Sequence, residues 1–321
     1  MNSSSSSVAG PLRTARLRRA VHGVLLLDKP VGMSSNHALQ RAKRLLRAEK
    51  AGHTGTLDPL ASGLLPLCFG AATKFAQACL DADKRYRATL VLGERTASGD
   101  RETPVIDRRE VTIERAAIDE VCRRFVGTID QVPPMHSALK KDGRALYDYA
   151  RAGIQLERAP RCVTIHRIDA VSWRSTELVL DVSCSKGTYI RTLADDIGRA
   201  LGCGAHLSAL RRTGVGRLDL RDAVTPDALE AVPEADRDAL LEPVDCLLAD
   251  WPMVRLDTEE AGRFLSGLRR RIDHADAAAV RVYGCEPDAF LGSAHIRGGE
   301  LIADRLMNPL EVRAATARAV L

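Results

Sequence analysis

The spacing of apolar positions predicts strands mixed with helices from Gly23 onward. Short or alternating apolar runs favour strands, and apolar positions three or four residues apart favour helices. The expected strands are residues 24–27, 64–69, 85–92, 163–171 and 178–183. The expected helices are the segment after the Ser34 and Ser35 cap and residues 73–80, 114–125 and 190–201. Without a strict βαβ repeat, this order predicts an α+β fold with a mixed, largely antiparallel sheet and flanking helices.

Two segments lack this regularity. Residues 52–59 predict a Gly-rich loop, and residues 127–144, which hold two adjacent prolines and two adjacent lysines, predict a mobile basic loop. Near the C-terminus, short strands separated by Gly and Pro predict a small β-rich module. These strands are residues 280–283, 290–296 and 301–303. We therefore expect a tail at residues 1–22, a main domain at residues 23–250 and a C-terminal domain at residues 251–321.

Charge is distributed unevenly along a chain whose net charge is +5. Residues 1–50 hold ten Lys or Arg and two acids, whereas residues 219–260 hold thirteen acids and three arginines. A polyanion would be attracted by one side and repelled by the other, which favours an oriented nucleic-acid surface over ordinary solvated helix faces. The serine-rich, acid-free tail predicts disorder, with an organellar transit peptide as the alternative.

The cysteines and the longest apolar runs indicate the compartment. Eight cysteines are scattered singly, without a C-x-x-C pair or a Cys/His cluster at zinc spacing, so we expect reduced thiols and no metal site. No apolar stretch approaches the roughly twenty residues that a membrane-spanning helix needs. We therefore expect a cytoplasmic protein, or an organellar one if the tail is a transit peptide.

The segment from Gly52 to Pro59 is the strongest candidate for chemistry. Pro59 biases Asp58 toward an extended backbone, and Gly52 and Gly55 permit a tight path and close approach. The segment therefore predicts a carboxylate presented from a rigid loop. Taken alone, an Asp-Pro pair is a common turn signal, so a plain turn is the alternative interpretation.

The longer string at residues 52–66, GHTGTLDPLASGLLP, resembles the active-site motif of the TruB family, the bacterial-type tRNA pseudouridine-55 synthases. Four further segments resemble motifs of this family in order and spacing, and together they span residues 23–217. They are the N-terminal motif at residues 27–32, the tyrosine motif at residues 83–86, the arginine motif at residues 185–191 and the pocket-closing segment at residues 206–212.

The resemblance implies a role for each matching residue. It makes Asp58 the nucleophile, Tyr86 the residue that stacks on the base, and Arg191 the partner of Asp58. The remaining contacts with the nucleotide fall to His53, Tyr189, Leu210, Lys29 and Pro30.

The resemblance also implies how RNA is held. The loop at residues 127–144, with Pro133, Pro134 and His136, resembles the family's RNA-clamping insertion. Residues 251–321 resemble its PUA-type RNA-binding domain more weakly. The expected partner is the T-arm of tRNA, bound by a monomer.

The implied reaction breaks the N1–C1′ bond of uridine and rejoins the base through C5, so atoms and redox state are conserved. No cofactor is therefore expected. The reaction requires an ionised nucleophile and a dry pocket that retains the detached base. Burial raises the pKa of an aspartate, and a neighbouring Arg191 favours the charged form of Asp58. Tyr86 offers a stacking face and a hydroxyl for proton removal from C5, while His53 fits a shape and hydrogen-bonding contact better than an acid or base.

Three alternatives stay open at the level of sequence. An RNA N-glycosylase would release the base with two carboxylates, the second from Asp195 or Asp196. A non-enzymatic RNA chaperone would use the same basic surface only to bind tRNA. A guide-RNA-dependent synthase would share the chemistry, but nothing in the sequence indicates protein partners.

Overall fold

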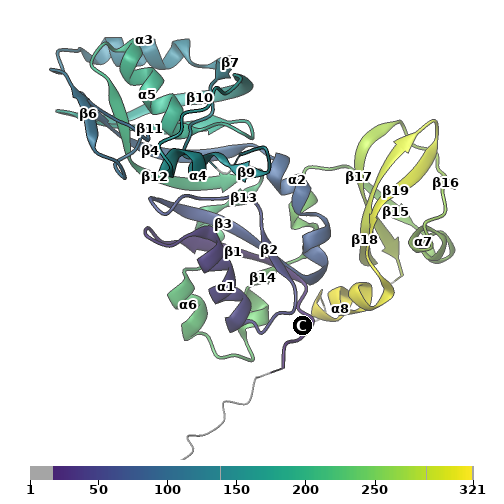
Figure 1. Cartoon of the computed structure of the whole chain (residues 1–321). Coiled ribbons are helices and arrows are strands. Elements are labelled where there is room, and N and C mark those ends of the chain that lie inside the picture. The colour runs from purple at the N-terminus through teal and green to yellow at the C-terminus, as the bar shows by residue number, and fades with distance from the viewer. Residues whose placement is uncertain (1–16, 138, 287, 320–321) are drawn as a thin grey trace, which may run out of the picture.

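The computed structural model describes residues 17–137, 139–286 and 288–319, and two sheets organise them (Figure 1). The larger sheet has ten strands, in the order β14-β1-β3-β12-β4-β11-β10-β7, with β2 paired to β3 and β13 to β12. Its strands are β1 (Gly23–Lys29), β2 (Ala51–His53), β3 (Ala61–Phe69), β4 (Lys84–Leu92), β7 (Gly127–Gln131), β10 (Arg161–Arg174), β11 (Glu177–Cys184), β12 (Ala205–Val215), β13 (Leu218–Asp219) and β14 (Leu241–Glu242). All pairings are antiparallel except that of β3 with β12. The α+β fold with a largely antiparallel sheet is confirmed.

Helices cover this sheet and bury apolar clusters against it. The helices are α1 (Ser35–Leu45), α2 (Ala76–Asp81), α3 (Arg115–Arg124), α4 (Leu146–Arg151), α5 (Ile190–Ala200) and α6 (Pro226–Ala231), with 3-10 turns η1 (Gly70–Lys74), η2 (Leu220–Asp222), η3 (Arg237–Leu240) and η4 (Val244–Leu248). One cluster joins α3 and α5 to β4, β10, β11 and β12, and a second joins α1 and α6 to β1 and β3. As expected, the Ser34 side chain caps α1, where it accepts a hydrogen bond from the His37 amide. The expected helix at residues 73–80 is divided between η1 and α2.

Two predicted loops contain strands. In the segment at residues 127–144, β7 pairs with β10 at the edge of the sheet, and the short β8 (Lys140–Lys141) and β9 (Arg144–Ala145) form a hairpin. The prediction of a mobile loop throughout that segment is therefore wrong, because an edge strand needs only one partner and little apolar periodicity. In the Gly-rich loop, residues 51–53 form β2. A further hairpin joins β5 (Glu94–Thr96) to β6 (Val105–Arg108).

The folded part begins before Gly23. Residues 1–16 of the predicted tail lie outside the described residues, but Arg19 forms a β-bridge with Ala48, and Val21 is buried. Two hydrogen bonds join the Arg19 guanidinium to Asp238, the longer at 2.6 Å. The described end of the predicted tail is thus packed against the main domain.

The acidic segment lies against the basic N-terminal segment. Arg41 on α1 pairs with Asp227 and Glu230 on α6, and Arg47 pairs with Glu234 at 2.9 Å. The expectation that the two segments form opposite sides of the protein is therefore wrong. Because α1 and α6 pack together, several N-terminal arginines are neutralised within the chain.

The second sheet confirms the expected β-rich C-terminal part. It has the order β15-β17-β18-β19-β16 and is flanked by two helices (Figure 1). Its elements are β15 (Met253–Leu256), α7 (Thr258–Leu265), β16 (Arg270–Arg271), β17 (Ala277–Cys285), β18 (Asp288–Arg297), β19 (Glu300–Leu306) and α8 (Pro309–Ala319). Phe290 stacks edge-on against Phe75 of the main domain at 5.1 Å, and Glu311 pairs with Lys74 at 2.5 Å. An apolar contact and an ion pair therefore join the C-terminal part to the η1–α2 turn of the main domain. None of the described helices is long and apolar enough to cross a membrane.

Candidate active site

The loop that carries Asp58 is fixed by hydrogen bonds from both sides. The Ser35 hydroxyl accepts from the Leu57 amide at 2.8 Å and donates to the Leu57 carbonyl at 2.9 Å. The Gly32 amide donates to the Pro59 carbonyl at 2.7 Å. With its neighbours held in this way, Asp58 presents a side chain that is 44% exposed. The expected rigid presentation of a carboxylate agrees with these contacts.

The first half of the loop depends on Gly55 and Thr54. Gly55 has a φ of +89°, a conformation that L side chains rarely adopt. The Thr54 amide donates to the Pro66 carbonyl at 3.1 Å, and the Thr54 hydroxyl accepts from the Cys79 thiol at 3.2 Å. These contacts join the loop to β3 and α2.

Arg191, at the start of α5, lies between two carboxylates. Its Nη2 is 3.1 Å from Oδ2 of Asp58, and its Nη1 is 3.2 Å from Oδ2 of Asp100. Nη2 also donates to the His136 carbonyl at 2.6 Å. Arg191 is 8% exposed and Asp100 is 1% exposed, so water screens the pair of Arg191 with Asp100 weakly.

Asp100 is a site residue that the sequence did not reveal. Its Oδ1 accepts from the Glu102 amide at 3.0 Å, and its carbonyl accepts from the Thr96 hydroxyl at 2.6 Å. In the sequence it follows Ser98 and Gly99, a combination that indicates a turn. The structure shows instead a buried carboxylate that holds one end of the Arg191 guanidinium.

Tyr86 and Leu210 lie at the junction of the two main apolar clusters. Each packs against the cluster under α5 and against the cluster under α1. On β4, Tyr86 stands opposite Arg212 of β12, and Leu210 stands opposite Ala88. Burial raises the pKa of the Tyr86 phenol, and the neighbouring Arg212 opposes that rise. The negative charge of Asp58 also raises this pKa.

His53 ends β2 just before the Asp58 loop. Burial lowers the pKa of its imidazole, and the positive charge of Arg212 lowers it further. Its Nδ1 is buried and forms no hydrogen bond with the described residues. A neutral ring with an unsatisfied nitrogen suits a hydrogen bond to a ligand.

Lys29 and Pro30 differ in their accessibility. Lys29 is fully buried, and its ammonium donates to the Pro30 carbonyl at 2.9 Å and to the Met33 carbonyl at 2.7 Å. Burial lowers the pKa of this ammonium to about 8, and Asp58 opposes the shift. Pro30 is exposed. Lys29 therefore supports the turn beside the Asp58 loop.

Tyr189 occupies the N-cap of α5. Its amide donates to the Gln131 side chain at 2.7 Å, and the Gln131 amide group donates to the Tyr189 carbonyl at 3.1 Å. No hydrogen bond joins the Tyr189 side chain to the Asp58 loop in the described part of the chain. The contacts of Tyr189 fix the helix start that carries Arg191.

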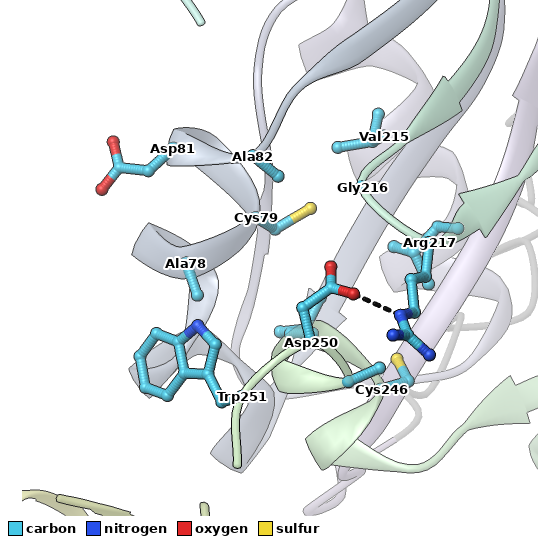
Figure 2. A pocket seen from close by; sticks show the side chains of 13 residues that line it. Ala78, Cys79, Asp81, Ala82, Val215, Gly216, Arg217, Cys246, Asp250 and Trp251 are labelled. Carbon is cyan, nitrogen blue, oxygen red and sulfur yellow. Dashed lines mark hydrogen bonds and ion pairs between the residues drawn. The ribbon is translucent and has the colours of Figure 1, made fainter. Parts of the chain in front are cut away.

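Two cavities are lined by the elements described above, and one of them borders the site. One, of about 590 Å³, lies beside Arg191 and is lined by Pro133, Pro134 and His136 of the segment that follows β7. The other, of about 270 Å³, lies between α2, η4 and the turn after β12. Figure 2 shows Cys79, Cys246 and Trp251 around it, with the ion pair of Arg217 and Asp250 at its edge. All eight cysteines are free thiols.

Comparisons with known proteins agree with the motifs of the site. The TruB family pseudouridylate synthase N-terminal domain matches residues 43–190, and the tRNA pseudouridylate synthase B C-terminal domain matches residues 191–249. The C-terminal domain of pseudouridine synthase II TruB matches residues 252–307.

Relatives match over almost the whole chain. The tRNA pseudouridine synthase B of Burkholderia mallei (strain ATCC 23344) is 57% identical over 302 residues, which are 92% of this chain and 97% of that protein. The protein of the same name from Verminephrobacter eiseniae is 57% identical over 94% of this chain and 93% of its own length.

Two solved structures share the fold. A Cbf5-Nop10-Gar1 complex contains a chain with a TM-score of 0.71 and 25% identity, covering 91% of this chain and 87% of its own. An H/ACA RNP bound to a substrate RNA containing 2′-deoxyuridine contains another, with a TM-score of 0.68, 23% identity and coverage of 92% and 93%.

Proposed function

The chain belongs to the TruB family and is a tRNA pseudouridine synthase, an isomerase, and from this premise we propose that it converts uridine 55 in the T-loop with Asp58 as the nucleophile. In this reaction the target nucleotide leaves the stack and enters the site at the Asp58 loop. The base detaches, turns while Asp58 holds the intermediate, and rejoins the ribose through C5.

The arrangement of Asp58, Arg191 and Asp100 carries the proposal. A nucleophilic carboxylate must stay ionised when RNA covers it and displaces water. Arg191 supplies the compensating charge at 3.1 Å from Asp58. The buried Asp100 fixes the other end of the guanidinium, so the geometry exists before substrate arrives.

Three further residues suit a pocket for the detached base. Tyr86 provides a face for stacking and a hydroxyl for hydrogen bonding. Leu210 supplies apolar surface, and the half-buried ring of His53 can contact the displaced nucleotide. We assign Tyr189 and Pro30 to nucleotide contact on the family resemblance, and Lys29 to support of the turn on its burial.

We propose that the T-arm is held by the segment after β7 and by the C-terminal sheet. Lys140 and Lys141 are exposed on the β8–β9 hairpin, where they can reach phosphates. Residues 251–321 would act as a PUA-like RNA-binding domain in a monomer. The relatives named above are bacterial, which favours the cytoplasm over an organelle.

The alternatives receive less support. Asp195, a candidate second carboxylate for an N-glycosylase, is paired with Arg95 at 2.8 Å and with Arg199 at 2.7 Å. A pure RNA chaperone has no use for the buried pair of Arg191 and Asp100. A guide-dependent synthase gains no support from the relatives, because those that are 57% identical are named as tRNA enzymes.

The proposal is tested by Asp58→Asn in a single-turnover assay on an unmodified tRNA transcript. We expect pseudouridine formation to stop while the Kd for tRNA stays within a few-fold, because the carboxylate acts in bond breaking. Asp107→Asn, at a surface ion pair on β6, is the matched control. Turnover by Asp58→Asn, or free uracil as the product of the parent enzyme, would overturn the assignment.

A further inference from the structure

Arg212 is one of the largest fully buried side chains in the protein, with 1% exposure. Its Nε donates to the Leu64 carbonyl at 2.7 Å, and its Nη2 donates to the Gly55 carbonyl at 3.5 Å. A Cβ atom added to Gly55 would lie 3.5 Å from its Nη1. The guanidinium therefore lies directly under the loop that carries Asp58.

No carboxylate compensates the charge of Arg212 within the described ranges, where it forms hydrogen bonds to carbonyls but no ion pair. An unpaired buried cation destabilises a protein relative to a well-packed apolar side chain. Burial lowers the pKa values of the Lys29 and Lys84 ammonium groups, and the positive charge of Arg212 lowers both further. Repulsion between Arg212 and these two cations therefore adds to the destabilisation. Stability alone does not explain a guanidinium at this place, and a role in the reaction would.

The register of the sheet directs Arg212 toward Tyr86. The two residues face each other across β12 and β4, and directly opposed side chains lie on the same face of a sheet. We propose that Arg212 is a positioning residue of the isomerisation, which orients and polarises the Tyr86 hydroxyl at the base. This inference rests on the proposed function, because it requires that Tyr86 meets the base.

The charges around Tyr86 support this assignment. Burial and the negative charge of Asp58 raise the pKa of the phenol, as does Cys184 beside it. The positive charge of Arg212 opposes them and lowers this pKa. A cation at this position makes the hydroxyl a stronger hydrogen-bond donor toward the carbonyl oxygens of a detached uracil.

The test is a double-mutant cycle between Arg212→Gln and Tyr86→Phe, measured as the single-turnover rate at saturating tRNA. We expect Arg212→Gln and Tyr86→Phe each to slow the step about tenfold or more, with the Kd for tRNA within a few-fold. In the Tyr86→Phe background, Arg212→Gln should cause little further loss, and Arg212→Lys should recover part of the rate in the parent background. Arg87→Gln, at an exposed ion pair with Asp181, is the matched control and should keep the parent rate.

Equal slowing by Arg212→Gln in both backgrounds would overturn the inference, because it would indicate an effect that bypasses the Tyr86 hydroxyl. A parent rate in Arg212→Gln would overturn it as well. Thermal melting shows whether Arg212→Gln is folded. If it is not, the cycle is measured with Arg212→Lys in its place, and equal slowing in both backgrounds again overturns the inference. Neither of these outcomes affects the assignment of Asp58 as the nucleophile, because turnover by Asp58→Asn tests that assignment separately.

Discussion

At the scale of single residues, the Arg191 guanidinium contacts Asp58, Asp100 and the His136 carbonyl, which belong to three separate segments. Only a planar group with several N–H donors can reach all three together. We predict that Arg191→Lys slows single-turnover pseudouridine formation at least about tenfold, because a point charge cannot hold Asp58 and Asp100 simultaneously. Arg199→Lys, at an exposed pair on the same helix, should keep the parent rate. A near-parent rate in Arg191→Lys would remove Arg191 from the site.

Lys29 gives a prediction for stability against pH. Its pKa is about 8 in the folded protein, against 10.5 for an unperturbed lysine, so between these values the unfolded chain binds more protons. The free energy of unfolding contributed by Lys29 therefore rises with pH across this window, by about 1 to 3 kcal/mol, and is constant below it. Urea denaturation at pH 7 and pH 10 should show this gain for the parent relative to Lys29→Met. Equal changes in the two proteins would contradict the prediction.

Some residues of the site can be predicted from the sequence, and others cannot. The string around Asp58 and the motif around Arg191 resemble a family closely enough to predict both, and the structure places the two side chains in contact. Their catalytic roles stay predictions. Asp100 and Arg212 are buried charges outside any apolar period, and what they do depends on partners distant in the chain. Such partners become visible only in the folded protein.

At the scale of elements, the sequence predicted most strands and helices but missed β12. This strand lies inside the sheet, where β4 and β3 pair with its two edges, and its residues show no regular alternation of apolar and polar types. Arg211 and Arg212 further obscured it, because adjacent arginines are typical of an exposed segment, although Arg212 is fully buried. Its neighbours β3 and β4 were predicted because their apolar runs are long or alternate regularly.

The parallel pairing of β3 with β12 depends on Gly63. Gly63 has a φ of +101°, and a Cβ atom there would lie 2.3 Å from the backbone oxygen of Arg212. We predict that Gly63→Ala lowers the free energy of unfolding in urea by at least about 2 kcal/mol. The matched control is Gly262→Ala on α7, where nothing lies within 4 Å and helix propensity favours alanine by up to about 1 kcal/mol. Equal stability of the two variants would contradict this account.

At the scale of the whole molecule, the internal pairing of α1 with α6 leaves other cations to bind RNA. We predict that tRNA binding weakens at least about tenfold between roughly 50 and 200 mM salt, since phosphate contacts release counterions. Replacing both Lys140 and Lys141 by Gln should reduce the slope of log Kd against log salt by roughly two. Arg41→Gln, where the arginine is already paired, should leave the slope unchanged. A parent slope in the double variant would exclude these lysines from phosphate contact.

The central position of β12 also affects how the protein is made. β3 ends at Phe69 and β4 at Leu92, but the strand between them begins only at Ala205. On the ribosome, the neighbouring edges of β3 and β4 are therefore synthesised long before their common partner and stay open for pairing with other chains. Sequence-distant pairing of this kind slows folding, so the Asp58 loop gains its final support late in synthesis. Chains that end before β12 should accumulate as aggregates without activity.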